Sequence, residues 1–434
     1  MGITIVVCLF LLGYLLIATE HIIKLDKAAS ALLLGGLLWV GVVVLQDIIP
    51  TSGDETKEGV LHHLFEGHVS EIASILFFLL GAMTIVEIID THEGFKIITD
   101  RIHAKSKISL LWIISIVTFF LSAILDNLTT AIVMTMLIKK LLKNKDDQWL
   151  IGSFVVIAAN SGGAWSPIGD VTTIMLWIGG QITSLHIIKE IFLPSVLSLA
   201  IPLAIMSYTF RGGQAFEMKG NNEAVMHPIK PEISRNVLIL GVAALIFIPI
   251  FKSLTHLPPF MGIIIGLGVL WYYTDLVHKK QHFEVRQKYS ISNIIRRVDT
   301  PSILFFLGIL LAVAALQTLG VLSDLANWLS NSIGNIYIIN VVIGLLSAIV
   351  DNVPLVAASI AMYPLETFPQ DHDFWVFLAY CAGTGGSCLI IGSAAGVAIM
   401  GILKIDFIWY LKKISWLALA GYLGGALFHY LMIS

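Results

Sequence analysis

The sequence is poor in charge: of its 434 residues, 13% are Asp, Glu, Lys or Arg, and 57% are hydrophobic. Soluble domains of ordinary composition carry roughly 25% charged residues. No polar stretch is long enough to fold as a soluble domain, and no basic cluster resembles a nucleic-acid-binding patch. The composition therefore argues against a soluble globular protein and against a partner made of nucleic acid.

Cysteine is also scarce. Cys8, Cys381 and Cys388 lie in apolar segments and have neither a disulfide framework nor the spacing of zinc ligands. There is no His-Glu-x-x-His motif, and the stretch Gly-Thr-Gly-Gly-Ser at 383–387 has no obvious base partner. We therefore expect neither an enzyme nor a protein with a bound cofactor.

Long apolar runs are abundant. Runs near 20 residues, the length of a transmembrane helix, recur along the whole chain. They predict an all-α integral membrane protein with ten crossing segments and two helical hairpins. The crossings are expected near 2–19, 28–49, 71–91, 149–180, 186–210, 233–251, 258–277, 301–322, 373–403 and 406–432, and the hairpins at 107–143 and 336–362.

The lysines and arginines predict an orientation. If the N-terminus is outside and each hairpin returns to its own side, 23 of the 26 basic residues fall inside, and only Lys57, Lys189 and Lys252 fall outside. Cytoplasmic loops carry the basic excess in membrane proteins. We therefore expect a multi-pass protein of the cytoplasmic membrane with both termini outside, and no lysine or arginine within the bilayer.

The hairpins are expected to re-enter rather than to cross. Eleven helical residues separate Asn127 from Lys139, and they reach about 17 Å, roughly half of the hydrocarbon core. Ten residues separate Asn352 from Tyr363. Both second arms are too short to span, so the hairpin tips should lie near the middle of the membrane.

The chain also contains an internal repeat. Three blocks recur in order: 120–134 as 345–359, 73–81 as 301–308, and 159–171 as 382–394, with offsets of 225, 228 and 223. Five crossings precede the second copy, so the two copies face opposite ways, a common plan of secondary transporters. The predicted organisation is a first inverted repeat at 1–210, a cytoplasmic linker at 211–232 and a second inverted repeat at 233–434. Each repeat has five crossings, one of them a broken helix, and one re-entrant hairpin.

Polar residues interrupt the apolar sequence twice in each repeat, at the hairpin tip and at a Gly-rich break. Irregular backbone at membrane depth is tolerated where it lines a cavity, and its free carbonyls suit Na⁺ together with Asn, Ser and Thr oxygens. The candidate cation and proton site comprises Asp126, Asn127, Thr129, Thr130, Asn160, Ser161, Asp170, Thr172, Thr173, Ser347, Asp351, Asn352, Thr384 and Ser387.

Helix capping is the simpler interpretation of these residues, since Asp, Asn, Ser and Thr all serve as caps. Several caps are expected among the residues that stand where short helices would begin, namely Asn127, Asp170, Asn352 and Ser393. Capping does not require a carboxylate, however, and an Asp within the membrane is costly and marks a functional site. By offset, Asp170 corresponds to Ser393 and Asn160 to Gly383. The first repeat therefore keeps more of the polar chemistry.

This asymmetry predicts that Na⁺ binds in the first repeat, while a proton competes for the same carboxylates. Asp351 is expected to serve mainly as a cap that helps to close the site. Glu87, within an apolar run near the inner surface, is a candidate proton relay. The predicted Na⁺ ligands are Asp126, Asn127, Asn160 and Asp170.

The stretches SAILDNLTTAIVM, ANSGGAWSPIGDVTTIMLW and SAIVDNVPLVAAS closely resemble the NhaD-type sodium/proton antiporters of the ion transporter superfamily. The resemblance covers nearly the whole chain. It implies exchange of Na⁺, and of Li⁺, for H⁺ by a homodimer in which a transport domain moves like an elevator against a scaffold. The scaffold would hold 1–49 and 233–277, and the transport elements 71–210 and 301–434.

An anion carrier remains the alternative, either a Na⁺-coupled carboxylate symporter or an arsenite-type oxyanion exporter of the same superfamily. The dicarboxylate symporters carry Ser-Asn-Thr at both tips, whereas this chain has Asp126-Asn127-Leu128-Thr129 and Asp351-Asn352-Val353-Pro354. Helix N-termini could bind an anion, but no intramembrane lysine or arginine is expected to pair with one.

Overall fold

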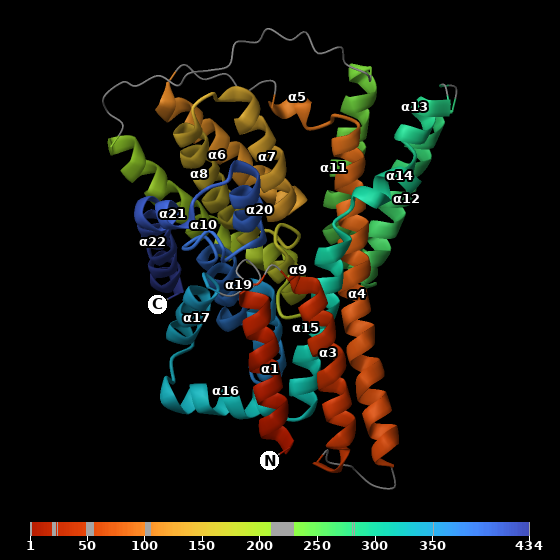
Figure 1. Ribbon diagram of the computed structural model, residues 1–434, viewed down its shortest axis with the longest axis vertical. Helices are drawn as coiled ribbons and strands as arrows, with labels where there is room; N and C mark the ends of the chain where they lie inside the picture. Colours follow the sequence, from red (N-terminus) through yellow and green to blue (C-terminus); the bar gives the residue numbers. More distant parts are fainter. Residues whose placement is uncertain are drawn as a thin grey trace.

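The computed structural model describes residues 2–19, 23, 25–48, 56–99, 106–209, 230–279, 281, 283–349 and 351–433. Their regular elements are helices, as the composition predicted (Figure 1). Among these residues, seven helices are long and apolar enough to cross a membrane, or eight if one pair bent by 117° is a single span. The chain is thus a multi-pass, all-helical membrane protein.

The first half of the chain follows the predicted segments with one clear difference. Its helices are α1 (Gly2–Ala18), α3 (Lys27–Val44), η1 (Gln46–Ile48), α4 (Lys57–Thr91), α5 (Lys96–Thr99), α6 (Lys107–Leu125), α7 (Asn127–Leu141), α8 (Lys145–Ala164), α9 (Val171–Ile178) and α10 (Ser184–Thr209). The sequence predicted a helix from residue 71, but α4 begins at Lys57. Thr56 caps it by accepting a hydrogen bond from the Gly59 N–H, so the helix continues through polar residues beyond the apolar run.

The second half contains a helix that the hydropathy pattern did not predict. Its elements are α11 (Pro231–Thr255), α12 (Pro259–His278), α13 (Phe283–Lys288), α14 (Ile291–Ile294), η2 (Ile295–Arg297), α15 (Thr300–Thr318), α16 (Val321–Ser332), α17 (Ile336–Leu346), α18 (Asn352–Met362), α19 (Asp373–Gly385), α20 (Ala394–Leu403), α21 (Phe407–Lys413) and α22 (Ser415–Ile433). Gly320, with φ of 74°, separates α15 from α16. Figure 1 shows α16 lying across the lower end of the molecule, nearly perpendicular to α1.

Six of the ten predicted crossings are single helices long enough to span: α3, α4, α10, α11, α12 and α15. The seventh such helix is α6, the first arm of the hairpin α6–α7. The remaining predicted crossings are the 17-residue α1 and three segments that are each divided into two helices: α8 and α9, α19 and α20, and α21 and α22. Re-entry of the hairpins into the membrane stays a prediction.

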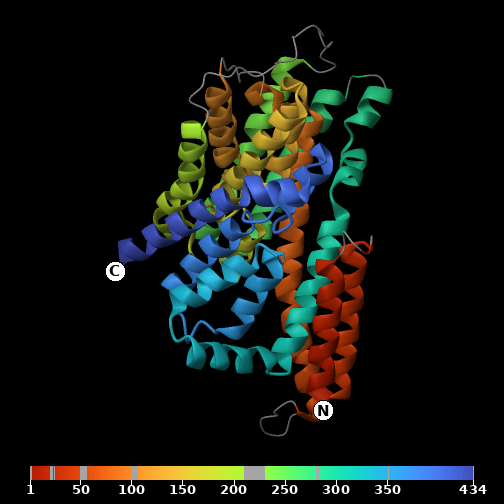
Figure 2. The same cartoon turned by 60° about the vertical axis from the view of Figure 1, so that its left-hand side comes forward.

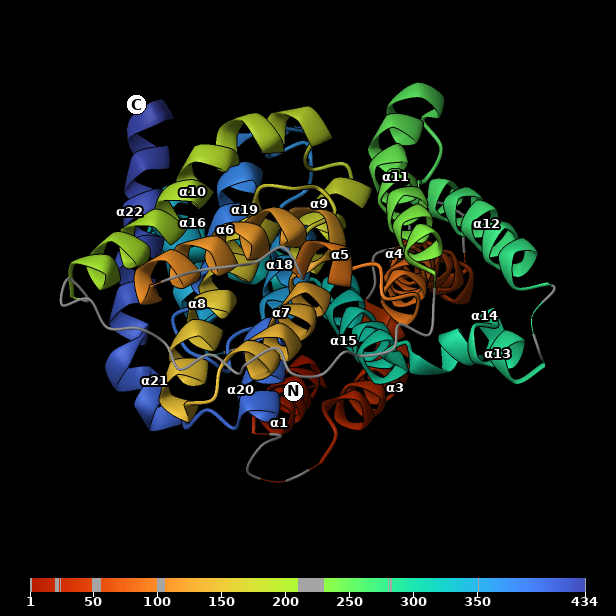
Figure 3. The same cartoon turned by 90° about the horizontal axis from the view of Figure 1, so that it is seen from above.

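Helix packing in one half of the chain has a counterpart in the other half. Helix α6 packs on α8 as α17 packs on α19, α7 on α20 as α18 on α9, and α3 on α15 as α12 on α4. Figure 1 shows α1 and α3 in the lower part of the molecule and α11 and α12 at its upper right. Figure 2 shows α1 and α3 beside α15, and Figure 3 shows α11 and α12 on the opposite side from α10 and α22.

Local contacts at the hairpins recur in the same way. The Ser122 hydroxyl of α6 donates to the Ala159 carbonyl of α8 over 2.6 Å, and the Ser347 hydroxyl donates to the Ala382 carbonyl over 2.9 Å. These bonds fasten the end of each first hairpin arm to the middle of a broken helix. Of the predicted linker 211–232, residues 211–229 lie outside the described residues, and α11 begins at Pro231.

Candidate cation site

Four half-helices begin around one small cavity of about 50 Å³, because α7, α9, α18 and α20 each contribute their first residues to its wall. Apolar side chains of α4 and α15, including Phe78 and Phe306, close its other sides. The two hairpin tips and the two Gly-rich breaks, which lie far apart in the sequence, therefore meet at one point. Of the described residues, the ionisable ones that line the cavity are Lys27, Asp126, Asp170 and Asp351.

The Asp170 carboxylate is the most densely bonded group of this site. Its Oδ1 accepts hydrogen bonds from the N–H and the hydroxyl of Thr172, both over 2.9 Å, and its Oδ2 accepts one from Asn127 Nδ2 over 2.6 Å. The Thr173 hydroxyl donates to the Asp170 carbonyl over 2.8 Å. Asp170 is 1% exposed, so a charge on it is desolvated, and these hydrogen bonds from described residues stabilise it.

Asn160 joins the two halves of the chain at this site. Asn127 Nδ2 donates to Asn160 Oδ1 over 3.2 Å. Asn160 Nδ2 in turn donates to the Ser387 hydroxyl over 3.0 Å and to the Ser393 hydroxyl over 2.9 Å. One amide thus links the first hairpin tip to the second Gly-rich break, and its oxygen stays near Asp170.

Asp126 has a backbone conformation that is unusual for any residue with a side chain. Its φ is 102° and its ψ is 159°, a region used almost only by glycine. Its carboxylate accepts hydrogen bonds from the Thr129 N–H over 2.7 Å and the Thr129 hydroxyl over 2.9 Å. Asp351, at the corresponding tip, has an ordinary φ of −49°. The first tip therefore retains an aspartate despite backbone strain, which indicates a role for the carboxylate itself.

This strain leads to a prediction for Asp126. Asp126→Gly should be more stable than Asp126→Asn by about 1 kcal/mol, because glycine relieves strain of roughly 1–3 kcal/mol and loses only a few tenths as a helix cap. Neither variant keeps the carboxylate, so neither should support ion exchange. The unfolding temperatures of the two purified proteins test this, and a glycine variant less stable than the asparagine variant would contradict it.

The second hairpin tip is arranged differently. Asp351 caps α18 by accepting from the Val353 N–H, and its Oδ2 lies 3.2 Å from Lys27 Nζ. Asn352 is 5% exposed, as Asn127 is, and it lines the same cavity as Asp170. Lys27 was expected in a cytoplasmic loop, and no lysine was expected to be available for pairing with an anion, but the structure places Lys27 in the wall of this cavity. Counting charges along the chain cannot detect that packing brings the start of α3 to the second hairpin tip.

The capping interpretation is confirmed in part. The caps of α7, α9, α18 and α20 are Asp126, Asp170, Asp351 and Ser393, each accepting from a backbone N–H of its helix. We expected Asn127 and Asn352 among the caps, but both are the first residue of a helix. Because the aspartates cap these helices, the Asn127 side chain is available to donate to Asp170, and Asn352 lines the same cavity.

Five predicted site residues neither line the cavity nor bond through their side chains to the polar residues around it: Thr130, Ser161, Ser347, Thr384 and Glu87. Ser347 donates instead to the Ala382 carbonyl. Thr130 is buried with its hydroxyl lacking a partner among the described residues, Ser161 accepts a bond from Ser198 of α10, and Thr384 donates to the Tyr380 carbonyl of its own helix. Glu87 lies 3.9 Å from Arg297 of η2 and accepts from the Thr91 hydroxyl over 3.4 Å. It is not part of the cavity wall.

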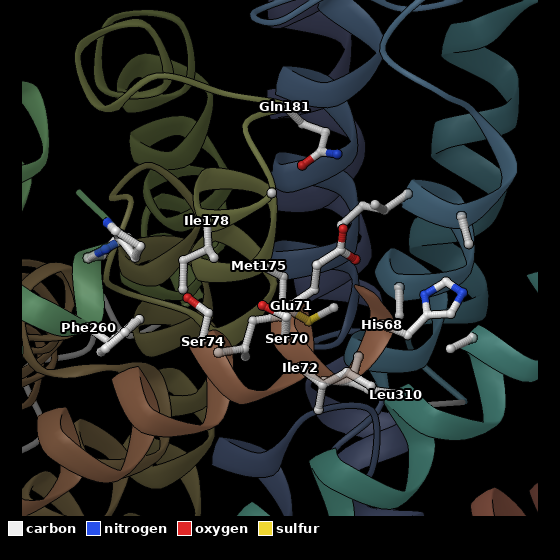
Figure 4. Close-up of a pocket in the computed structure, with 18 of the residues that line it drawn as sticks. His68, Ser70, Glu71, Ile72, Ser74, Met175, Ile178, Gln181, Phe260 and Leu310 are labelled. Atoms are coloured by element: carbon white, nitrogen blue, oxygen red, sulfur yellow. The ribbon is translucent and has the colours of Figure 1, made fainter. Parts of the chain in front are cut away.

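A second cavity of about 580 Å³ extends along the same helices, since α4, α9, α15 and α18 contribute to both. Figure 4 shows Glu71 near the centre of the view, with His68 to its right and Gln181 above it. Lys252 also lines it and donates to the Trp177 carbonyl at the end of α9, a favourable place for a cation. We call this cavity the vestibule.

A helical membrane protein whose half-helices begin around a buried polar cavity has the architecture of a secondary transporter. The sequence matches the profile of the citrate transporter family over residues 14–375. It is 49% identical to "Sodium/proton antiporter 1" of Arabidopsis thaliana over 96% of this chain and 70% of that protein. It is 46% identical to "Sodium/proton antiporter 2" of the same plant, over 96% of both chains.

A bacterial relative, "Na(+)/H(+) antiporter NhaD" of Alkalimonas amylolytica, is 31% identical over 91% of this chain and 83% of its own length. The chain belongs to this family of NhaD-type sodium/proton antiporters, which confirms the resemblance seen in the sequence. The family profile is named after the transport of an anion, citrate. The three relatives are instead named as sodium/proton or Na⁺/H⁺ antiporters.

Proposed function

We propose that the protein exchanges Na⁺, and also Li⁺, for H⁺ across the cytoplasmic membrane. The observation that carries this proposal is a pair of aspartates, the partly buried Asp126 and the fully buried Asp170, beside the Asn127–Asn160 amide chain at one small cavity. The names of the relatives agree with it. Carboxylate and amide oxygens are the hard ligands that a dehydrated alkali cation requires.

Competition for the same oxygens would couple the two movements. A cation at Asp170 Oδ2 and Asn160 Oδ1 would displace the Asn127 amide hydrogens that now occupy these oxygens. A proton on the same carboxylate would remove the charge that holds the cation. The site would then carry either ion across but not both together, which is the requirement for exchange.

Charge also favours a cation over the anion alternative. Lys27 and the four helix N-termini offer positive charge in the cavity, and the family profile names citrate. However, Lys27 is paired with Asp351, and each helix start is already capped, three of them by carboxylates. When Lys27 and the three aspartates of the cavity are all ionised, three negative charges face one positive charge, so an anion would be repelled.

The architecture of the mechanism is proposed as well. The matching helix contacts in the two halves of the chain support two inverted repeats. Both hairpins pack with both broken helices, which supports a single transport unit. This unit would move as an elevator against α1, α3, α11 and α12. The vestibule would be the route by which ions reach the site. A homodimer with both termini outside belongs to the same proposal.

Everted membrane vesicles with a pH-sensitive dye test the function. We expect Na⁺ and Li⁺ to dissipate an acid-inside gradient, and citrate and arsenite to have no effect. Vesicles that contain Asp170→Asn protein at the same level serve as the control, because they separate exchange at this site from leakage. If neither cation moves protons in vesicles with the unmodified protein, antiport fails, and a response to citrate or arsenite would establish the anion alternative.

A further inference from the structure

Lys27, the first residue of α3, takes part in a charged contact that the exchange mechanism above does not use. Its Nζ lies 3.2 Å from Asp351 Oδ2 and 4.5 Å from the centre of the Phe305 ring. The two side chains of the pair are only 25% and 16% exposed. At such burial, loss of one partner leaves a charge without compensation, so the pair restrains its surroundings more than a surface ion pair does.

Lys27 is held in place by the packing of α3 on α15. Gly35 and Gly308 allow the two helices to touch, because a Cβ at Gly35 would lie 2.6 Å from the Gly308 carbonyl oxygen. Trp39 Nε1 donates to the Leu311 carbonyl over 3.0 Å. The start of α3 therefore cannot shift without moving α15, and Lys27 reaches the cavity from a firmly packed helix pair.

Asp351 belongs to the second hairpin, which packs on α15 through α18 and on the broken helix α19 through α17. It caps the start of α18, and Ser347 ties the end of α17 to Ala382. The ion pair thus links the α3–α15 pair to the second hairpin at the edge of the candidate cation site. Any displacement of the hairpin relative to α3 must separate these two charges.

We propose that Lys27 is a positioning residue that acts through Asp351. It neutralises this third carboxylate, keeps it from binding the transported cation in this conformation, and holds the second hairpin tip against α3. The proposal rests on the proposed Na⁺/H⁺ exchange and explains why only Asp126 and Asp170 are left for the cation, although three aspartates line the cavity.

The first test measures the unfolding temperature of purified Lys27→Met, Asp351→Asn and the double variant, with Lys27→Arg as the control that keeps the charge. Each neutralising change should lower the unfolding temperature by roughly 5 °C, and the double variant should lose less than the sum of the two. This measurement requires no transport. Strictly additive losses, or none, would overturn the ion pair as a restraint.

The second test measures the Na⁺ concentration that gives half-maximal exchange in vesicles. Lys27→Met frees Asp351 as an extra carboxylate, so half-saturation should fall by about threefold or more, while Lys27→Arg resembles the unmodified protein. Adding Asp351→Asn should return half-saturation toward its original value. A role in folding alone would change the maximal rate through the amount of protein, and would leave half-saturation unaltered.

Two outcomes of the second test would overturn the proposal. One is an unchanged half-saturation in Lys27→Met. The other is a folded double variant without saturable Na⁺ dependence, because Asp351 would then be a ligand itself. If the unmodified protein shows no Na⁺-dependent exchange, the proposed function fails, and the unfolding temperatures still decide whether Lys27 and Asp351 are coupled.

Discussion

Asp170→Asn is expected to abolish Na⁺/H⁺ exchange in a protein that still folds and inserts. Asp170 Oδ2 accepts from Asn127 Nδ2 over 2.6 Å, and an asparagine amide at this position would place one donor against another. The variant also loses the negative charge. Removal of one charged ligand from a desolvated cation costs about 3 kcal/mol or more, a factor of roughly 100 in affinity.

Folding should survive this change because the cap survives. The asparagine oxygen can still accept from the N–H and the hydroxyl of Thr172, which now bond to Asp170 Oδ1. Dye measurements in vesicles and the amount of protein in the membrane check both parts. Asp146→Asn is the matched control, because Asp146 is exposed at the start of α8.

Exchange above a tenth of the normal rate in Asp170→Asn would remove this carboxylate from the cation site. Asp126→Asn should also lose exchange, since its carboxylate lines the same cavity. Asp351→Asn should lose less of the exchange activity than Asp126→Asn does, because Asp351 is paired with Lys27. Equal losses at Asp126 and Asp351 would contradict the asymmetry between the two tips.

Gly162→Ala and Gly385→Ala are each expected to disrupt folding. At Gly162 a Cβ would meet the Phe119 carbonyl group, with 2.8 Å to its carbon, and at Gly385 it would meet the Gly344 carbonyl group, with 2.7 Å to its carbon. Because the obstacles are backbone atoms, no side chain can rotate away, and the crossing helices must separate. Overpacking of this kind costs about 1–3 kcal/mol or more.

These two crossings position the site, so exchange should decline together with stability. They hold α6 against α8 and α17 against α19, next to the Ser122 and Ser347 hydrogen bonds. Gly36→Ala is the matched control, because a Cβ there meets nothing within 4 Å. It should be neutral or stabilising by about 0.5–1 kcal/mol. Detergent-solubilised yield and unfolding temperature distinguish the variants, and a Gly162→Ala protein as stable as Gly36→Ala would refute the close crossing.

Helices and their interruptions were predictable because their causes are local. Apolar runs identified α10, α11 and α12 within a few residues, and the Gly-rich stretches identified the breaks before α9 and α20. The first turns of α4 were missed because they are polar and depend on a cap at Thr56. Helix α16 was missed because an amphipathic helix across the end of the bundle has no long apolar run.

The members of the site were largely predictable, but their partners were not. Intramembrane aspartates and asparagines are costly, so Asp126, Asn127, Asn160 and Asp170 stood out in the sequence. The choice between Ser387, which reaches Asn160, and Ser161 and Thr384, which bond elsewhere, depends on which face of a helix each side chain occupies.

The sequence by itself determined that the chain is a helical membrane protein, where its helices break, and which family it belongs to. These properties follow from apolar length, from glycine and from motifs, all of which act over a few neighbouring residues. Only the tertiary structure decided that Lys27 meets Asp351 and that Glu87 meets Arg297 instead of the cavity. Which side chains pair depends on how helices that are far apart in the sequence pack together. No local sequence pattern specifies the position at which α3 packs along α15.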